Sequence, residues 1–369
     1  VEATRNLADD QTDNTVFVFN TYEIGPEVSI TVPKILLPFR GCKKTKNANA
    51  FTVFTTNYNL QNRPEFRRAI LKFSAGWGWK LNRFVEMRYY LAEINFVDVS
   101  LTDAFRQSLI NIGDPGLIDS YEDHLIPSGR ISFIYNDQKF GKSKNFSFLR
   151  FDIETAGNLM YGIDKARNTN PNSEGKFELL GIRYAQYIKP EADLRYYHYL
   201  NKTTTMVYRI NGGIGIPYTN SEVLPFEESF YGGGPNDLRA FRTRKLGPGG
   251  FDEGDKVEQT GEIKINANLE YRFDIFKSFK GAAFIDAGNI WLSSKEDSKP
   301  NAHFEASRFL DEIAIGTGLG IRLDFQFFII RFDGGIKVKD PGRPKGNRWV
   351  LDETKFRKVN FNIGIGYPF

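Results

Sequence analysis

Apolar and polar side chains alternate along much of this chain, and this pattern constrains its fold more than any other feature. It is clearest over residues 263–273, where the odd positions are Ile, Ala, Leu, Tyr or Phe and the even positions are Lys, Asn, Glu or Arg. Successive side chains of a β-strand point to opposite faces, so this segment predicts a strand with one apolar and one polar face. Soluble sandwiches and membrane barrels both contain such strands, so strand number and length must decide between them.

Similar segments recur from one end of the chain to the other. The clearest cover residues 27–32, 68–80, 130–135, 149–154, 206–210, 281–290, 320–326, 330–338 and 361–369, and looser ones cover 51–58, 87–97, 178–187 and 194–200. Many reach about ten residues, the length that a tilted strand needs to cross a bilayer, whereas globular strands centre on about five or six. Their polar faces carry full charges, such as Arg150, Asp152 and Glu154, which fit a wet barrel lumen.

These segments predict an all-β fold, a transmembrane antiparallel β-barrel. The count is about 14 or 15 strands, and a first strand that begins upstream of Val1 would bring it to about 16, an even number. Residues 1–369 then form one outer-membrane barrel domain without a linker. Long polar intervals at 101–123, 157–175, 220–259, 292–312 and 340–356 are expected to form the larger loops, on the outer side.

Composition excludes several other classes of protein. No run approaches the roughly 18 apolar residues of a spanning helix. The net charge is only +4, and the lysines and arginines are scattered, so a nucleic-acid partner is not expected. The single cysteine, Cys42, cannot form an intrachain disulfide. Val1 starts no signal peptide, which predicts a processed or truncated piece.

Catalytic and metal-binding motifs are missing from the sequence. His124, His198 and His303 are far apart and lack metal-ligand spacing. No serine stands in a Gly-x-Ser-x-Gly elbow. The glycines of GTGLG at 316–320 lie in a strand pattern without the Gly-Lys-Ser/Thr of a phosphate loop, and we interpret them as small residues that relieve barrel curvature. The sequence therefore predicts a non-enzymatic protein without a metal or other cofactor.

A glycine-rich, cationic stretch, residues 230–250, lies between the alternating segments. Six of its 21 residues are glycine, and four basic residues against Asp237 leave it at +3. Glycine permits backbone turns that other residues resist, so the stretch can fold back tightly instead of continuing a sheet. Long loops of this kind are usually functional or disordered. Composition alone favours a solvated outer loop, because charged side chains are normally exposed.

The chain ends on another alternating segment. Its apolar face consists of Phe361, Ile363, Ile365, Tyr367 and Phe369. A terminal strand that closes on an aromatic residue resembles the signal by which outer-membrane barrels are recognised by their assembly machinery. An ordinary amphipathic edge strand has the same pattern, and the barrel-like strands that precede this one favour the signal.

Several motifs together resemble one family. They are LPFEESF at 224–230, GGGPNDLRAF at 232–241, LGPGG at 246–250, FIDAGNIW at 284–291 and the terminal GYPF. They are similar to motifs of the BamA/TamA superfamily of outer-membrane assembly and translocation barrels, most of all to its TamL-like lipoprotein branch. The resemblance implies a functional loop folded into the lumen, with Gly232, Gly233, Gly234, Leu238, Arg239, Ala240 and Phe241 as its residues. The superfamily usually has glycine where this chain has Ala240, which alters the close backbone approach expected there.

An arginine folded into the lumen needs partners, because an unpaired buried charge costs several kcal/mol or more. Glu270 lies on the polar face of its strand, and Asp286 is in register with Phe284 on the next strand. We predict that Arg239 pairs with Asp286 and Glu270 and that Phe284 covers the guanidinium plane. In the family that the motifs resemble, the loop arginine contacts the matching residues of the inner wall.

The resemblance implies a factor that helps other proteins enter or cross the outer membrane. Its partners would be outer-membrane lipids, unfolded outer-membrane protein clients and accessory or periplasm-spanning proteins. Members of the family carry periplasmic repeat domains before the barrel, and some carry a lipid anchor; we expect neither within residues 1–369.

The mechanism expected is a weak seam between the first and last strands, because an unpaired strand edge can template a substrate strand. Residues 361–369 would form one side of this seam. The alternatives are a secretion pore of the two-partner type, a passive porin, and a barrel enzyme such as a phospholipase.

Overall fold

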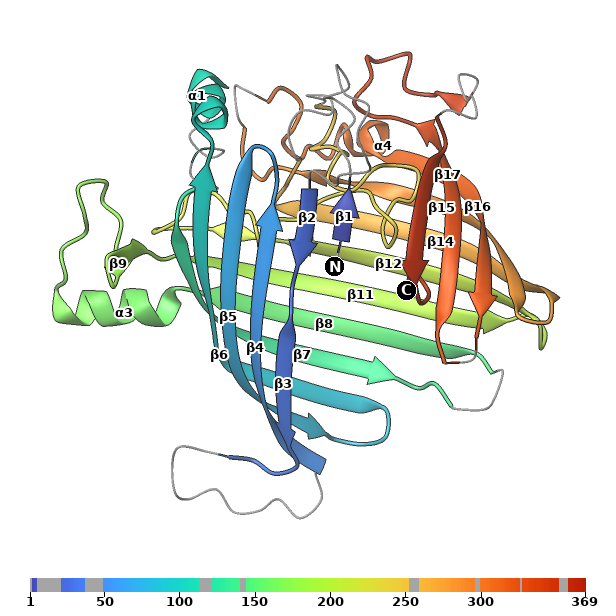
Figure 1. The fold of residues 1–369 in the computed structure, drawn as a ribbon, viewed down its shortest axis with the longest axis horizontal. Helices are drawn as coiled ribbons and strands as arrows, with labels where there is room; N and C mark the ends of the chain where they lie inside the picture. Colours follow the sequence, from blue (N-terminus) through green and yellow to red (C-terminus); the bar gives the residue numbers. More distant parts are fainter. Residues whose placement is uncertain are drawn as a thin grey trace, which may run out of the picture.

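The computed structural model of the chain consists mainly of one large antiparallel sheet (Figure 1). It describes residues 2–4, 21–36, 49–112, 118, 121–139, 144–251, 259–295, 299–325, 327–351 and 358–369. Cys42 lies outside the described residues, as does most of the segment before the second strand.

Sixteen strand segments form the sheet, which confirms the prediction of an all-β fold with about sixteen strands. In chain order they are β1 (Glu2–Thr4), β2 (Thr21–Ile24), β3 (Glu27–Val32), β4 (Asn49–Asn62), β5 (Phe66–Lys80), β6 (Val85–Leu101), β7 (His124–Asn136), β8 (Phe146–Ala156), β11 (Tyr187–Tyr199), β12 (Thr204–Ile214), β13 (Ile216–Pro217), β14 (Ile263–Phe276), β15 (Phe279–Trp291), β16 (Ala314–Asp324), β17 (Ile329–Lys339) and β18 (Asn360–Ile365). β2 and β3 both pair with β4, and β12 and β13 both pair with β11. Most of these strands have eleven or more residues, which is the length that a tilted strand needs to cross a bilayer.

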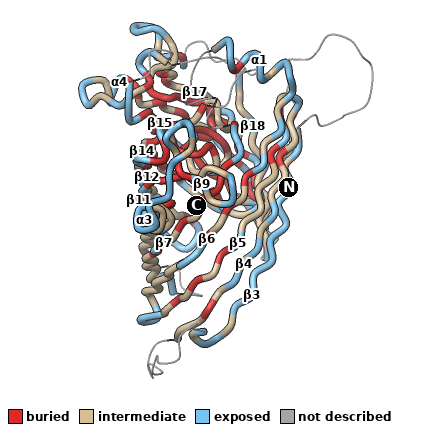
Figure 2. The backbone as a smooth tube through the Cα atoms, turned by 90° about the vertical axis from the view of Figure 1, so that its left-hand side faces the viewer, coloured by how far each residue is buried: buried red, intermediate tan, exposed pale blue. Residues whose placement is uncertain are grey.

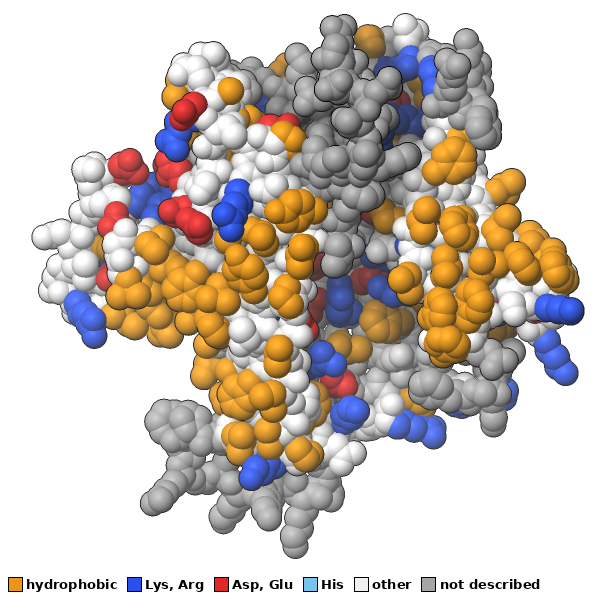
Figure 3. Space-filling model, viewed as in Figure 1, with side chains coloured by type: hydrophobic (Ala, Val, Ile, Leu, Met, Phe, Trp, Pro, Cys, Tyr) orange, Lys and Arg blue, Asp and Glu red, His pale blue; other side chains and the backbone are white. Residues whose placement is uncertain are grey.

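The sheet buries its polar face and exposes its apolar face, the reverse of a soluble sandwich. On β14, Asn268 and Glu270 are buried, whereas Tyr271 is exposed. Hydrophobic side chains accordingly gather on the outer surface in Figure 3. An apolar exterior around a polar interior is the arrangement of a transmembrane barrel.

Burial is not uniform around the sheet. Figure 2 shows buried segments gathered around β14, β15 and β17, whereas β3 is exposed along most of its length. The cause is a long connection between β13 and β14 that lies against the inner face of the later strands, as described below. The interior is therefore filled unevenly.

Among the described residues, three helices and a small hairpin lie in connections between the barrel strands. They are α1 (Asp103–Ile112), α3 (Asn158–Arg167), α4 (Phe309–Glu312) and the pair β9 (Glu178–Leu179) and β10 (Ile182–Arg183). The helices occupy segments that the sequence predicts as long loops. None of the helices among the described residues is long and apolar enough to cross a membrane.

The hairpin corrects one prediction, the strand at residues 178–187. Leu180 and Gly181 have positive φ angles of 57° and 78°, which turn the chain back on itself. β9 and β10 therefore pair with each other, apart from the large sheet. The barrel strand begins only at Tyr187 and continues unbroken to Tyr199.

The first and last strands of the sheet are β1 and β18. Within the described residues, β1 pairs only with β2, and β18 pairs only with β17. Both strands are short, with three and six residues, whereas β5 has 15. The structure therefore has two short strand edges at the place where the sheet would close.

Candidate functional site

The glycine-rich stretch belongs to a connection that we call the inner loop, residues 218–251 and 259–262. It runs across the inside of the sheet between β13 and β14, in yellow in Figure 1. Gly233 and Gly234 have φ angles of 86° and 105°, a region that favours glycine. The amide of Gly234 then donates to the carbonyl of Phe241 at 2.9 Å and closes a compact turn. The stretch is thus an ordered element rather than a flexible outer loop.

The apolar residues of the inner loop form a small core of their own. Leu238, Ala240, Phe241 and Leu246 are buried together with Ala314 at the start of β16. Gly232 forms an isolated antiparallel bridge with Leu246, which joins the two ends of the turn. The seven loop residues singled out from the sequence therefore lie in one folded unit.

Arg239 projects from this unit onto the inner faces of β14 and β15. Its Nε and Nη2 donate to the two oxygens of Asp286, each at 2.9 Å, and its backbone amide donates to Asp286 Oδ2 at 3.1 Å. Its Nη1 pairs with Glu270. The guanidinium carbon lies 3.5 Å from the ring centroid of Phe284. The structure thus brings together the four residues that sequence reasoning grouped.

The guanidinium of Arg239 is fully buried. Burial alone would lower the pKa of Arg239, but the carboxylates of Asp286 and Glu270 outweigh that effect and raise it. The arginine is therefore charged at every accessible pH. Its charge is matched by a bidentate carboxylate, the geometry that makes arginine pairs strong.

The pair belongs to a wider charge network on the inner wall. Glu270 also pairs with Arg272 at 2.6 Å and with Arg322 at 3.3 Å. Arg322 in turn pairs with Asp333 on β17 at 2.7 Å. The network extends over four neighbouring strands, β14 to β17, so Arg239 links the inner loop to a large part of the wall.

Ala240 is accommodated by glycines of the wall. A Cβ added to Gly335 would lie 2.8 Å from the backbone nitrogen of Ala240, and one added to Gly316 would collide with the Ala240 methyl group. The close backbone approach therefore persists although the loop itself carries alanine. Gly316, for which we predicted a role in barrel curvature, leaves space for the loop.

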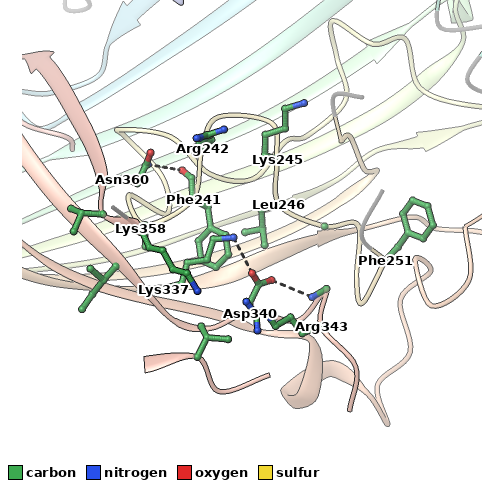
Figure 4. Close-up of a pocket in the computed structure, with 16 residues that line it drawn as sticks. Phe241, Arg242, Lys245, Leu246, Phe251, Lys337, Asp340, Arg343, Lys358 and Asn360 are labelled. Atoms are coloured by element: carbon green, nitrogen blue, oxygen red, sulfur yellow. Dashed lines mark hydrogen bonds and ion pairs between the residues drawn. The ribbon is translucent and has the colours of Figure 1, made fainter. Parts of the chain in front are cut away.

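Two asparagines of the last strand also hold the loop, and sequence reasoning missed them. Asn360 and Asn362 donate their side-chain amides to the carbonyl of Arg239 at 2.8 and 2.9 Å. Asn360 donates to the carbonyl of Phe241 as well, at 3.2 Å (Figure 4). Both are the polar residues that alternate with Phe361 and Ile363, so attention to the polar face of the terminal segment would have found them.

The prediction that residues 361–369 form one strand needs a correction. Phe361, Ile363 and Ile365 lie on the outer face of β18 and are exposed, but the strand ends at Ile365. Gly366 has a φ angle of 87°, which turns the chain away from the sheet.

The last residues therefore do not continue the lipid-facing row that the alternation predicted. Phe369 is buried, with its ring centroid 5.8 Å from the Arg239 guanidinium carbon. The ring of Tyr367 lies 4.2 Å from the guanidinium carbon of Arg272. The physical reason for the inward turn is glycine at position 366, because other residues resist this backbone conformation.

A second buried arginine, Arg68 on β5, holds the beginning of the inner loop, and sequence reasoning did not find it. Its Nε lies 3.0 Å from Glu227, which also pairs with His124 Nε2 at 3.0 Å. The rings of Phe226, Phe66 and Tyr121 surround the guanidinium, with the centroid of Phe226 at 4.2 Å.

Burial alone would raise the pKa of Glu227, but Arg68 and the hydrogen bond from His124 outweigh it and hold the pKa at about 2. Glu227 is therefore a carboxylate under all ordinary conditions. It fixes the loop to the earlier strands β5 and β7. The inner loop is consequently attached on both sides of the barrel interior.

A cavity of about 490 Å³ remains between the inner loop and the last two strands. Figure 4 shows its lining, with Phe241, Arg242 and Lys245 from the loop and Lys337 and Asn360 from β17 and β18. Lys337 pairs with Asp340 at 2.9 Å. The interior beside β18 is therefore not completely packed. No group of three His, Cys, Asp or Glu side chains suited to a metal occurs within the described ranges.

Comparison with known proteins identifies the family of this chain. The Omp85 superfamily domain matches residues 19–369. The outer membrane protein assembly factor BamA of Neisseria meningitidis serogroup B is 31% identical over 123 residues, which cover 32% of this chain and 15% of that protein. The chain thus spans a small part of this curated relative.

Two solved structures share the fold. BamA from Haemophilus ducreyi lacking POTRA domains 1–3 has a TM-score of 0.59 and 13% identity, over 93% of this chain and 61% of that chain. CdiB from Escherichia coli has a TM-score of 0.51 and 11% identity, over 86% and 49%. The TamL-like branch stays a prediction. The match over nearly the whole chain, together with the barrel fold, shows that this protein is a bacterial outer-membrane barrel that belongs to the Omp85 superfamily.

Proposed function

We propose that this barrel assembles proteins into the outer membrane, or moves them across it, through a lateral seam between β1 and β18. An unfolded outer-membrane protein client would pair its strand with the edge of β18. The observation that carries this proposal is the contact between the inner loop and β18, through Asn360 and Asn362.

The strand edges support the proposal. β18 has six paired residues with β17, and it ends at Ile365, before the turn at Gly366, so few ladder bonds hold it. An edge strand with unpaired backbone groups readily accepts another strand. A short edge strand also separates more easily than a long one, because fewer hydrogen bonds must break.

The inner loop gives the seam a support that the ladder lacks. The carbonyl of Arg239 accepts hydrogen bonds from β18, while its side chain is held by Asp286 on β15 and Glu270 on β14. The same residue thus connects the last strand to the wall. We infer that docking of Arg239 sets the position of β18 and that its release lets the seam open.

A disulfide that locks the seam tests the mechanism. In a Cys42→Ser background, a cysteine at Ile363 on β18 would be combined with one at Glu2, Ala3 or Thr4 on β1, and the combination that oxidises would be chosen. We expect the oxidised protein to lose the ability to speed the folding of an unfolded eight-stranded barrel into vesicles, and reduction to restore it.

A matched control is a disulfide between Phe332 and Ile363, which face each other across β17 and β18. It adds a crosslink beside the seam without closing it, so activity should persist. Full activity of the locked β1–β18 protein would refute lateral opening. Passage of an unfolded chain through the locked barrel would instead favour a secretion pore.

A further inference from the structure

Helix α3 is held outside the barrel wall by its first residue. The side-chain oxygen of Asn158 accepts hydrogen bonds from the side chain of Gln186 at 3.0 Å and from the hydroxyl of Tyr218 at 2.9 Å. Figure 1 shows the helix projecting sideways from the sheet, with β9 above it. These bonds tie its start to the segments that border β11 and β13.

One face of α3 packs against its own small core. Tyr161 contacts Phe177 edge-on at 5.5 Å, and Asp164 accepts a hydrogen bond from the hydroxyl of Tyr184 at 2.8 Å. Phe177 and Tyr184 are buried together with Leu125 of β7. The orientation of the helix is therefore fixed by packing as well as by its first residue.

The opposite face of α3 is apolar and uncovered. Leu159, Gly162, Ile163 and Ala166 follow the spacing of one helical face. Leu159 is 71% exposed, and nothing lies within 4 Å of a Cβ built at Gly162. With its apolar neighbours on the same face, this leucine forms a small exposed patch, and contiguous apolar patches mark surfaces that meet a membrane or another molecule.

This face continues the lipid-facing surface of the barrel. Ile188 and Ile216, paired on β11 and β13, are exposed on the outer wall, and Ile188 also pairs with Thr155, three residues before α3. In Figure 3 the hydrophobic side chains around α3 merge with those on the outer face of the barrel, and charged side chains gather above them. Such a division between polar and apolar sides matches a membrane surface.

We propose that α3 lies in the lipid interface at the end of the barrel that carries the long loops, with its Leu159 face in the acyl-chain boundary. Amphipathic helices with basic residues on their polar side bind such interfaces. Lys165 and Arg167 in the last turn suit anionic lipid headgroups. Because a rigid core orients the helix, its insertion fixes the depth and tilt of the barrel next to β8 and β11.

Depth-dependent fluorescence quenching tests this proposal. In a Cys42→Ser background, a Gly162→Cys variant would carry an environment-sensitive dye in vesicles of phosphatidylcholine and phosphatidylglycerol. We expect lipids with a nitroxide near the top of the acyl chain to quench the dye strongly, and aqueous iodide to quench it weakly. A dye at Glu174→Cys, on the exposed connection after α3, should show the opposite pattern.

A Leu159→Glu substitution in the labelled protein should reduce the lipid quenching several-fold. The barrel should still migrate as a folded protein in gel electrophoresis without heating. Strong iodide quenching at residue 162 together with weak nitroxide quenching would overturn the proposal. So would a dye shielded from both quenchers, because that result would mean that a protein, and not lipid, covers the helix.

Discussion

Two buried arginines, Arg239 and Arg68, hold the same inner loop but do so in different surroundings. Arg239 pairs with two carboxylates of the wall and is covered by one ring at 3.5 Å. Arg68 pairs with Glu227, a carboxylate of the loop itself, and three rings lie around its guanidinium. The direction of attachment is thus reversed, since the loop supplies the cation at one side and the carboxylate at the other.

The difference separates a switchable attachment from a permanent one. The residues around Arg239 include Asn360 and Asn362 on the edge strand β18. Those around Arg68 include Phe66 and Tyr121, which pack with Leu109 of α1. We infer that the Arg68 side anchors the loop and that the Arg239 side communicates with the seam.

Replacement of Arg239 should have the largest effect on both stability and client folding. Arg239→Ala leaves Asp286 buried without its arginine partner and removes one of the cations around Glu270, and breaking a buried pair in this way costs about 3 to 5 kcal/mol. We expect a large drop in the free energy of unfolding in urea and loss of client folding. Arg242→Ala, three residues along the same loop at an exposed position, should change stability by only about 0.5 kcal/mol. Equal effects of the two substitutions would contradict a docked Arg239.

Replacement of Arg68 should have the next largest effect, but on stability more than on function. Arg68→Met keeps an unbranched side chain inside the ring cage and removes one partner of Glu227, for a loss of about 3 kcal/mol. Client folding should persist at temperatures where the variant is folded. If Arg68→Met abolished client folding while the barrel stayed intact, the division between anchor and seam contact would be wrong.

The pH dependence of unfolding, compared between the unchanged protein and Arg68→Met, tests the pairing of Arg68 with Glu227. Glu227 has a folded pKa of about 2 against an ordinary value of 4.5. A lowered carboxyl pKa stabilises the fold above the ordinary value, and this contribution is lost as pH falls from about 4.5 towards 2, with a total of about 3 kcal/mol. Arg68→Met should flatten this part of the stability profile, measured by urea unfolding at each pH. An unchanged slope would show that Glu227 does not depend on Arg68.

A double-mutant cycle tests how closely the inner loop packs against the wall next to Arg239. Gly316→Ala introduces a methyl group that collides with that of Ala240, and such overpacking costs about 1 to 3 kcal/mol. Ala240→Gly in the same protein should restore most of the loss, because it removes the colliding atom. At Gly335 the collision is with the loop backbone, so Gly335→Ala should not be rescued by Ala240→Gly. Rescue at both positions would mean that the loop shifts freely.

The asparagine contacts should give the smallest effect on stability. Asn362→Ala removes one hydrogen bond to the Arg239 carbonyl, and a single bond contributes about 1 kcal/mol. Hydrogen exchange of the β18 amides should nevertheless accelerate, while that of β5 stays unchanged. Unchanged exchange in β18 would show that this contact with the loop does not stabilise the last strand.

Strand alternation was enough to predict the barrel, whereas the contacts of Arg239 followed only when the resemblance of the loop motif was added to it. The parity of Glu270 and Asp286 on neighbouring strands places both on the inner wall, whatever their distance in sequence from the loop. The Arg68 cage could not be predicted in this way, because Tyr121 and Phe226 lie in connections where no periodicity applies. The inward turn of Phe369 depends on the φ angle of one residue, Gly366, which alternation does not encode.

The central claim is that docking of Arg239 holds the last strand in place at the seam. The most direct test is a distance measurement by electron paramagnetic resonance between spin labels at Ala3 on β1 and Ile363 on β18, in the Cys42→Ser background. The account predicts a narrow distance distribution in the otherwise unchanged protein and a broad, longer one in Arg239→Ala, while Arg68→Met stays narrow. Identical distributions in all three proteins would contradict the claim.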